Sequence, residues 1–510
     1  MDRRTFIKTA VATAVAAGHA AAQGTAASKT VQIDLRRETG PFPHYWERAA
    51  GSDRSAVAFR SQWQQDLRRA RELTGIQSVR CHGLFDDEMG VCRAVGADGP
   101  QLSFLYVSEI FDTMLDLGVK PFVELGFMPT PMASGPNTVF FYKGNVTPPA
   151  RMEHWAQLVT GFTAHCVKRY GITEVKQWQF ECWNEPNLRF FWAGSQDQYF
   201  ELYRATAAAV KSVDGRIAVG GPSTAQVAWL PAFIEYCASR NVPLDFVSTH
   251  IYSGDPQRAI FGKANAWPLE EVMPRALAQC RDQVRASKLP DLPLLITEWA
   301  SQNPAFIAQT IRDCAGLAAT MSYWTFSNVF EEMGPATRFF NSMFGMIGQR
   351  GVARPSLHAF TMLHRLGDQR LSAADGPVLA TRRADGSRAV LAWNLPSKAS
   401  GQSGLPGIMG RGGDPVAQAQ EEMQGDPLRL TLRFAGLGDS RARVTSIDMI
   451  RGSALTAWQA MGKPEYPTAA EIRTLRDAAS LPAAETRPAR NGELTLELPP
   501  SGLALVEVQK

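Results

Sequence analysis

Short apolar runs alternate with helical patterns from about residue 40 to residue 370, and this alternation limits the fold more than any other feature. The runs have the length of buried strands, and helical periodicity fills the segments between them. The strand-like runs are 78–80, 120–125, 176–182, 217–220, 246–250, 294–297 and 322–326. About eight βα units in about 330 residues predict an α/β fold, the (β/α)₈ barrel. A doubly wound sheet is the alternative, but no Gly-rich phosphate-binding fingerprint follows an early strand.

The pattern changes after residue 367, where strand-like runs follow one another without helices between them. Asp385-Gly386 separates two apolar runs and is a strong hairpin signal. The strand-like runs are 378–382, 388–393, 428–434, 444–450, 493–498 and 503–508. They predict an antiparallel β-sandwich over residues 371–510, packed on a catalytic barrel of residues 30–370. The Gly-rich segment 401–413 joins no strand to a helix and is interpreted as a flexible loop.

The N-terminal end of the barrel segment has its own strand signal. Residues 31–35 alternate between apolar and polar side chains, as a half-buried strand does. We expect a first strand at residues 30–36 that pairs with the sandwich, which would join the two ends of the mature chain.

Residues 1–22 read as a twin-arginine-type export signal. Arg3-Arg4, Phe6 and Lys8 precede a stretch, residues 9–28, that has no Asp, Glu, Lys or Arg. We expect cleavage after Ala20-Ala21-Ala22. An uncleaved anchor is the alternative, but the run is too short and too weakly apolar to span a bilayer. The mature protein is therefore expected to be exported, periplasmic or secreted, without a membrane partner.

Charge and cysteine content exclude several classes of protein. The net charge is +4, or +2 without residues 1–22, and the chain has no basic stripe, so nucleic acid is not an expected partner. The 7 cysteines are odd in number and show no CxxC spacing, which predicts buried free thiols rather than disulfides or a zinc site. No HExxH, Walker loop or serine nucleophile elbow is present, so neither a metal nor an organic cofactor is expected. The sequence leaves the oligomeric state open.

Two glutamates lie where a barrel enzyme carries its catalytic groups. Glu185 follows the fourth strand in Asn184-Glu185-Pro186, and Glu298 ends the seventh strand, so the two are expected to face each other across the barrel mouth. A lone glutamate at a strand end is usually structural. Two carboxylates across a cleft, however, are what glycoside hydrolysis requires, and the Asn184 amide suits a sugar 2-hydroxyl. Trp183, Phe190, Phe191 and Trp192 crowd the same segment, as sugar-stacking faces or as core.

In these segments the chain resembles glycoside hydrolase family 39, the β-xylosidase and α-L-iduronidase family. The likeness covers roughly residues 40–370 and weakens in the C-terminal region. It includes Arg-Cys-His-Gly at 80–83, Trp-Asn-Glu-Pro-Asn at 183–187 and Tyr-Trp-Thr-Phe at 323–326. The segments that carry it are 80–90, 121–129, 144–149, 178–192, 246–252 and 322–332.

The resemblance implies a retaining mechanism, with Glu185 as general acid/base and Glu298 as nucleophile. It also implies a set of substrate-binding residues, in which histidines and a tyrosine contact sugar hydroxyls or the nucleophile, aromatic rings form a wall, and a glutamate binds the distal hydroxyls. These residues are His82, His250, Tyr252, Asn184, Phe127, Trp324 and either Glu331 or Glu332. The expected activity is exo-hydrolysis of β-D-xylosyl residues from xylo-oligosaccharides.

Two segments depart from the β-xylosidase pattern. Residues 300–304 form a shorter stretch after Glu298, and residues 340–345 replace a Phe-His-Gly-Gly-Phe-Gly motif. In that family both segments help to wall the sugar pocket, so an α-L-arabinoside or an α-L-iduronide is an alternative substrate. An iduronate needs a cation beside its carboxylate, for which Arg80, Lys143 and Arg189 are the candidates in sequence. A barrel that binds carbohydrate without cleaving it is a further alternative. Such a protein would typically lack one of the two catalytic carboxylates, whereas Glu185 and Glu298 are both present.

Overall fold

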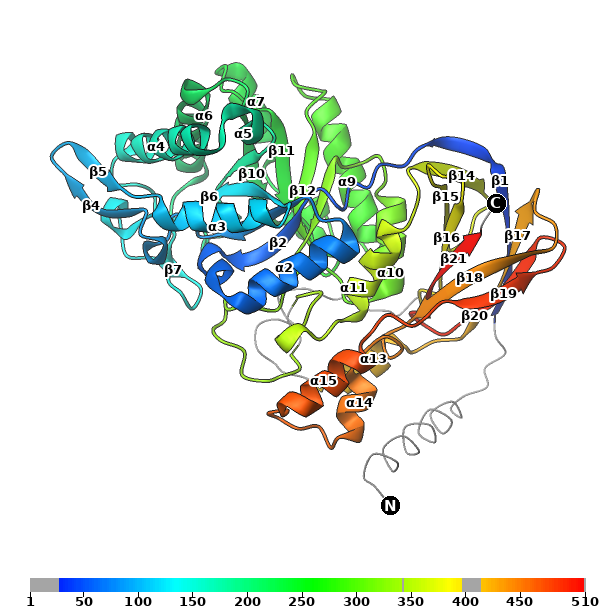
Figure 1. Ribbon diagram of the computed structural model, residues 1–510. Coiled ribbons are helices and arrows are strands. Elements are labelled where there is room, and N and C mark those ends of the chain that lie inside the picture. Colours follow the sequence, from blue (N-terminus) through cyan, green and yellow to red (C-terminus); the bar gives the residue numbers. More distant parts are fainter. Residues whose placement is uncertain (1–26, 342–343, 397–413, 509–510) are drawn as a thin grey trace.

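The computed structural model describes residues 27–341, 344–396 and 414–508, and its larger part is a closed parallel barrel (Figure 1). The barrel strands are β2 (Ala50–Arg54), β3 (Ser78–His82), β6 (Lys120–Leu125), β9 (Gln179–Cys182), β10 (Ala218–Thr224), β11 (Phe246–His250), β12 (Leu294–Trp299) and β13 (Thr320–Tyr323). The predicted (β/α)₈ barrel is confirmed. The predicted export signal, the segment 401–413 and residues 342–343 of the departing 340–345 segment lie outside the described residues.

Helices cover the outside of the barrel, and most of them bury one face. Those longer than one turn and a half are α2 (Ser61–Thr74), α3 (Leu105–Asp116), α4 (Met152–Tyr170), α6 (Gln196–Val213), α7 (Leu230–Ser239), α9 (Leu269–Arg285), α10 (Pro304–Asp313) and α11 (Pro355–His364). In α9 the buried positions include Val272, Ala276 and Cys280, four residues apart, which is the spacing of one helix face. Ser195 begins α6 with a capping box that includes Gln198.

The first barrel strand, β2, carries no apolar run. Its sequence is Ala-Gly-Ser-Asp-Arg, yet all five residues are buried. Gly51 lies against the indole of Trp324, and a Cβ there would collide with that ring. The barrel therefore closes through a strand whose small residues make room for a large side chain of the site.

The C-terminal region forms a second, mostly antiparallel sheet, as predicted. Its order is β19-β18-β21-β16-β15-β14-β1-β17-β20. The strands are β1 (Ala27–Pro41), β14 (Gln369–Ala373), β15 (Val378–Arg382), β16 (Arg388–Trp393), β17 (Leu428–Ala435), β18 (Ser440–Ile447), β19 (Glu485–Ala489), β20 (Glu493–Leu498) and β21 (Leu503–Val508). The edge strands β19 and β20 are consecutive in the chain, so the sheet folds over on itself around one apolar core. The short helices α13 (Pro415–Glu422), α14 (Leu455–Ala460) and α15 (Ala469–Ala478) were not predicted.

Strand β1 belongs to this second sheet and not to the barrel. It runs parallel to β17, with Ala27 opposite Leu428, and antiparallel to β14, with Ile33 opposite Ala373. The chain thus enters the sheet first, builds the whole barrel and then returns to the sheet.

The two parts pack through one face of the sheet. Along β16, Val390 and Ala392 belong to the core of the sheet, whereas Leu391 and Trp393 belong to the core of the barrel, as the alternation of a strand requires. The Trp393 indole donates a hydrogen bond of 3.1 Å to Gln309 of α10. Barrel and sheet therefore share a continuous apolar contact, and α10 lies beside β16 (Figure 1).

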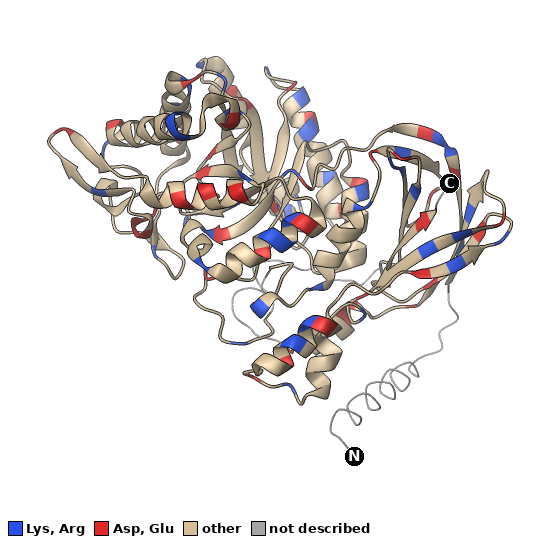
Figure 2. Cartoon of the chain, viewed as in Figure 1, with Lys and Arg blue, Asp and Glu red and all other residues tan. Residues whose placement is uncertain are grey.

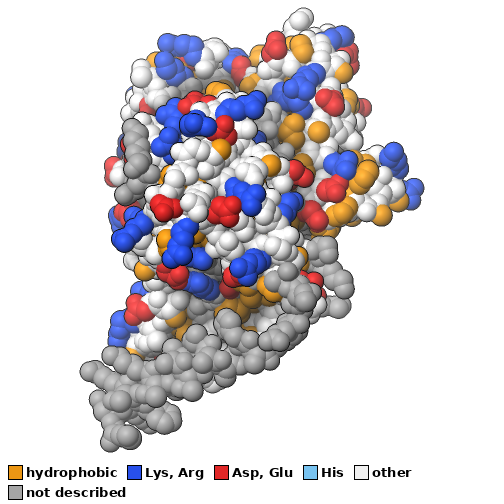
Figure 3. Space-filling model, turned by 90° about the vertical axis from the view of Figure 1, so that its right-hand side faces the viewer, with side chains coloured by type: hydrophobic (Ala, Val, Ile, Leu, Met, Phe, Trp, Pro, Cys, Tyr) orange, Lys and Arg blue, Asp and Glu red, His pale blue; other side chains and the backbone are white. Residues whose placement is uncertain are grey.

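Charged residues of both signs and buried cysteines characterise the described part of the chain. Basic and acidic side chains are interspersed over the elements and on the face drawn in space-filling form (Figures 2 and 3). All seven cysteines are buried free thiols, as predicted. Within the described residues, no helix has both the length and the apolar character needed to cross a bilayer.

Candidate active site

The two predicted carboxylates meet at the C-terminal end of the barrel. Glu298 lies on β12, and Glu185 follows β9 on a turn in which Trp183 and Glu185 have φ angles of 69° and 45°. The amide of Glu185 is fixed by a hydrogen bond of 2.8 Å to the Ser223 carbonyl. One oxygen of Glu185, one of Glu298 and a ring nitrogen of His250 all lie within 4.8 Å of one another. The site therefore brings together carboxylates that are 113 positions apart in the printed sequence.

Glu298 is held by one donor on each oxygen. Arg80 Nη1 donates to Oε1 at 2.9 Å, and the Tyr252 hydroxyl donates to Oε2 at 2.9 Å. Burial raises the pKa of Glu298 above its usual value, and the Arg80 charge and the Tyr252 hydrogen bond offset only part of that rise. These contacts favour the ionised carboxylate and fix its orientation.

Arg80 connects Glu298 to two more buried carboxylates. Its Nε atom lies 2.6 Å from Glu181, and its Nη2 atom lies 2.9 Å from Glu124 and donates at 3.0 Å to Asn184 Oδ1. Burial opposes the charge of Arg80, but the surrounding carboxylates raise its pKa, so it stays protonated. Glu124 and Glu181 were not among the predicted site residues. Both could have been found from the sequence, because each is a charged residue within an apolar, strand-like run.

Glu185 has the opposite electrostatic setting. Burial and the nearby Glu298 charge hold its pKa well above the usual value. His250 Nδ1 lies 2.9 Å from Glu185 Oε1, and burial, Arg80 and His82 hold the pKa of His250 well below its ordinary value, so the imidazole is neutral. Of the two glutamates, Glu185 is the one that retains its proton.

His82 lies between the predicted nucleophile and Glu332. Its Nε2 atom is 3.6 Å from an oxygen of each, and its Nδ1 atom is 2.8 Å from Glu124. Burial lowers the pKa of His82 to about 3 and raises that of Glu124 to about 8. A neutral imidazole in this place can exchange hydrogen bonds with sugar hydroxyls without adding a charge.

Glu331 and Glu332 differ in what they contact. The Glu331 carboxylate accepts hydrogen bonds from Arg54, at 3.1 Å, and from Arg60. Glu332 has no such arginine pair among the described contacts, and burial and Asp53 hold its pKa well above the usual value. Of the two, Glu332 is the one beside His82 and the catalytic pair.

The aromatic residues divide into wall and core. The Trp324 ring lies 4.6 Å from the His82 ring, and the Phe127 ring lies 5.4 Å from the Trp183 ring. Trp183 donates to the Phe191 carbonyl at 2.7 Å, and Trp192 donates to the Ser195 carbonyl at 2.9 Å. Trp183 and Trp192 are therefore satisfied core residues, which the sequence left open.

The three cations considered for an iduronate carboxylate lie in very different places. Arg80 is buried and engaged by the carboxylates around it, whereas Lys143 and Arg189 are exposed. Arg54, the other buried arginine beside the site, contacts Glu88 and Glu331. Both buried arginines are thus already paired with carboxylates of the protein, and neither is available to bind the carboxylate of an anionic sugar.

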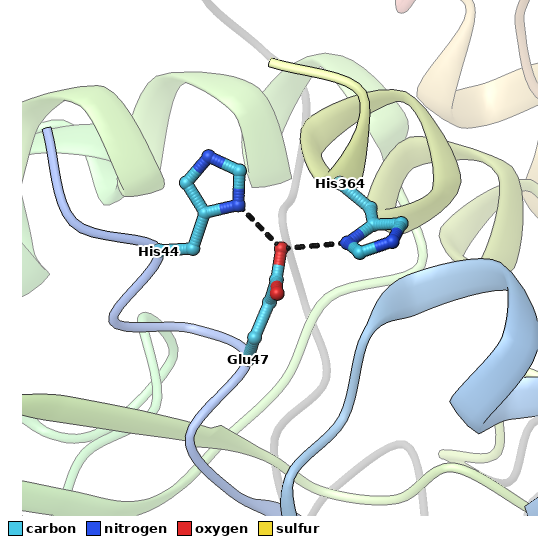
Figure 4. Close-up of side chains that lie close together, drawn as sticks. All are labelled: His44, Glu47 and His364. Carbon is cyan, nitrogen blue, oxygen red and sulfur yellow. Dashed lines mark hydrogen bonds and ion pairs between the residues drawn. The ribbon is translucent and has the colours of Figure 1, made fainter. Parts of the chain in front are cut away.

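Two groups of described residues have the donor atoms of a metal site. One is Glu185, His250 and Glu298; the other is His44, Glu47 and His364 (Figure 4). In the second, Glu47 Oε1 accepts hydrogen bonds from both Nδ1 atoms, at 2.6 Å from His44 and 2.9 Å from His364.

This second group fits a hydrogen-bonded clamp better than a metal centre. The Nε2 atom of His44 is buried without a hydrogen-bond partner among the described atoms, whereas a metal-bound histidine almost always donates its second N–H. His44 and Glu47 precede β2, and His364 ends α11, so the clamp joins the chain that enters the barrel to its last helix. It lies at the end of the barrel opposite the catalytic pair.

Comparison with known proteins agrees with this geometry. The model of "Glycosyl hydrolases family 39" matches residues 29–495. A β-xylosidase of Geobacillus stearothermophilus is 35% identical over 494 residues, which cover 92% of this chain and 93% of the relative. A β-xylosidase of Caldicellulosiruptor saccharolyticus is 38% identical over 359 residues, covering 67% and 72%. The crystal structure of the family 39 enzyme of Xanthomonas axonopodis pv. citri superposes with a TM-score of 0.82 at 29% identity, covering 96% of this chain and 99% of the other.

Proposed function

The chain belongs to glycosyl hydrolases family 39 and is a glycoside hydrolase, and from that premise we propose that it is a retaining, exo-acting β-D-xylosidase. In this proposal it releases terminal xylosyl residues from xylo-oligosaccharides through a glycosyl-enzyme intermediate. The observation that carries the mechanism is the spacing of Glu185 and Glu298. One oxygen of each lies within 4.8 Å of the other, a closeness that favours the carboxyl separation of about 5–5.5 Å in retaining enzymes over the 6.5–9.5 Å of inverting ones.

In the first step, Glu298 attacks the anomeric carbon while Glu185 transfers its proton to the glycosidic oxygen. The carbon–oxygen bond to the leaving group breaks, and the leaving group departs as an alcohol. Glu298 becomes an ester and loses its charge, so the repulsion that raised the pKa of Glu185 disappears. Glu185 can then take a proton from water as the water oxygen attacks the anomeric carbon and frees Glu298.

The neighbouring side chains support this assignment. Because Arg80 donates to Asn184 Oδ1, the amide is oriented with its NH₂ group available for the sugar 2-hydroxyl, a contact that strengthens in the transition state. His82 and Glu332 are placed to bind other hydroxyls of the same ring, and Trp324 and Phe127 to cover its apolar face. These roles are part of the proposal.

The choice of xylose is supported by the names of the two similar β-xylosidases and by the charge around the site. Glu124, Glu181 and Glu298 surround one Arg80, and Glu332 lies beside His82, so an anionic sugar would be repelled there unless a free cation faced it. This argues against an iduronide. Xylose carries no C6 group and needs no such cation.

The test is a panel of 4-nitrophenyl glycosides, with wild type beside Glu298→Ala and Glu185→Ala. We expect cleavage of the β-D-xylopyranoside, with β-xylose as the first product seen by NMR. Azide should rescue Glu298→Ala with formation of α-xylosyl azide, and Glu185→Ala with β-xylosyl azide, because azide replaces a different group in each. Cleavage of only an arabinoside or a uronide would contradict the assignment of xylose as the substrate sugar. Release of α-xylose as the first product would contradict the retaining mechanism.

We also propose export through the twin-arginine route, on the basis of Arg3-Arg4, Phe6 and Lys8. Replacing both arginines by lysine should leave the protein in the cytoplasm, with its activity intact, when cell fractions are assayed. Periplasmic activity unchanged by that double substitution would contradict the proposal.

A further inference from the structure

Phe190 stands out because its ring is exposed, whereas the other aromatic residues of its own segment are buried. It is 51% exposed, whereas its neighbours Phe191 and Trp192 are 5% and 1% exposed. The same rim carries Phe141 and Met333, exposed large side chains on the loops after β6 and β13. A single exposed apolar side chain is ordinary, but several gathered at the rim of one site indicate a surface that contacts a ligand.

Phe190 is joined to the catalytic pair by a series of ring contacts. Its ring centroid lies 4.6 Å from that of Phe191, which lies 5.2 Å from that of Phe140. Phe140 stacks on His82 at 5.8 Å, and His82 lies 3.6 Å from Glu298. The apolar surface at the rim is therefore continuous with the side chains that surround the nucleophile.

The backbone ties Phe190 to Glu185 in particular. The Leu188 amide donates to the Glu185 carbonyl at 3.0 Å, and the Phe191 amide donates to the Leu188 carbonyl at 2.9 Å. These successive turns hold Phe190 at a fixed place relative to the carboxylic acid. Since the acid protonates the oxygen of the leaving group, the leaving group emerges on the side of Glu185.

We propose that Phe190, supported from behind by Phe191, is the stacking platform for the leaving sugar of a xylo-oligosaccharide. The C–H face of a pyranose is apolar and packs on an aromatic ring, which would cover the exposed surface during binding. Phe190 is then a specificity-determining residue for the leaving group and has no part in bond cleavage. This inference rests on the proposed function and extends it from the sugar that is transferred to the sugar that departs.

The test compares two substrates that share the transferred sugar and differ in the leaving group. Xylobiose leaves a pyranose ring, whereas the xylosyl fluoride of the configuration that wild type hydrolyses leaves a single atom. Phe190→Ala should lower kcat/KM for xylobiose about 10-fold, mostly through KM, because one aromatic contact of this size corresponds to about that factor. Hydrolysis of the fluoride should stay within about two-fold of wild type, and Phe190→Trp should keep activity on xylobiose.

Tyr466→Ala is the matched control, because Tyr466 is an exposed aromatic residue of the C-terminal region, between α14 and α15. It should change neither rate. Equal losses on xylobiose and fluoride for Phe190→Ala, or no loss on either, would overturn the platform. If wild type cleaves neither xyloside, the proposed function is wrong. The platform is then tested by the same comparison on the disaccharide that the enzyme does cleave and the fluoride of its terminal sugar.

Discussion

Arg80 Nη1 lies 2.9 Å from Glu298 Oε1, and the arginine side chain is completely buried. The same guanidinium contacts Glu124 and Glu181, so one positive charge on β3 balances three buried carboxylates, which lie on β6, β9 and β12. The charge state of Glu298 thus depends on Arg80, which lies on β3, the second strand of the barrel.

Removal of this charge should affect both folding and chemistry. Arg80→Met leaves buried carboxylates without their counter-charge, and we expect it to lower the free energy of unfolding by about 3–5 kcal/mol in urea titrations. Arg80→Lys keeps the charge but cannot reach Glu181, Glu298 and Asn184 together. It should fold with a smaller loss, yet its kcat should fall by about 100-fold. A lysine variant with wild-type kcat would show that the charge alone is sufficient.

The Tyr252 hydroxyl should act on Glu298 and on little else. Tyr252→Phe removes one hydrogen bond to a carboxylate, for which about 1.5–3 kcal/mol is typical, so kcat/KM should fall about 10- to 100-fold. The acid limb of the pH profile should also move to higher pH, because that hydrogen bond lowers the pKa of Glu298. Tyr236→Phe is the control, since Tyr236 donates to Glu201 on the outer helices. Equal effects of the two substitutions would contradict a role at the site.

Activity should fall at high pH because Glu185 must be protonated when the leaving group departs. Burial and Glu298 hold its pKa well above the usual value, so the proton is kept at mildly acid pH and lost as pH rises through that raised pKa. Glu185→Gln should abolish this alkaline limb and slow substrates with poor leaving groups by about 10²- to 10⁴-fold. A 2,4-dinitrophenyl xyloside, which needs no acid, should lose far less in its first step. An unchanged alkaline limb would assign that limb to another group.

The clamp of His44, Glu47 and His364 gives a stability prediction with a definite sign. Burial raises the pKa of Glu47, but the hydrogen bonds from His364 and His44 lower it by more. The pKa of Glu47 therefore lies below its usual value. A carboxyl whose folded pKa is lowered stabilises the fold above its unfolded pKa and loses that effect as pH falls through the folded pKa. Glu47→Gln should therefore lower Tm at pH 7, through loss of about 1–3 kcal/mol, and the difference from wild type should shrink below about pH 4.5.

A chelator separates the clamp from a metal site. If the three side chains are held by hydrogen bonds alone, EDTA should leave the Tm of wild type unchanged. A drop in Tm on EDTA that is absent in His364→Ala would show a bound metal and contradict the clamp.

The sequence predicted the elements that carry their own pattern. The Asp385-Gly386 turn marked the hairpin of β15 and β16, and the apolar run at 294–297 marked β12. Strand β2 was not named, because Ala-Gly-Ser-Asp-Arg has the composition of a loop. Its burial comes from neighbours on both sides and from the Trp324 ring over Gly51, which no local pattern contains.

The same distinction applies to the site. Glu185 could be placed because it follows closely after a recognisable strand, and Glu298 because it lies near the end of one, each in a distinctive motif. The contacts of Arg80 could not, because they join β3 to β6, β9 and β12 and exist only once the barrel closes. Nor could the sequence distinguish Phe190 from Trp192, since exposure within an irregular turn depends on how that turn is anchored to Glu185.

The position of β1 has a consequence for how the protein is made. During translation β1 (Ala27–Pro41) is synthesised before the barrel, whereas its partner strands β14 and β17 are synthesised only after the entire barrel. Until then β1 has no neighbour on either side, and a chain interrupted after the barrel would leave a bare strand open to pairing with other molecules. Expression of either part alone, or interruption of translation, should therefore give aggregation rather than a smaller folded unit, so the first strand is protected only in a chain whose synthesis has been completed.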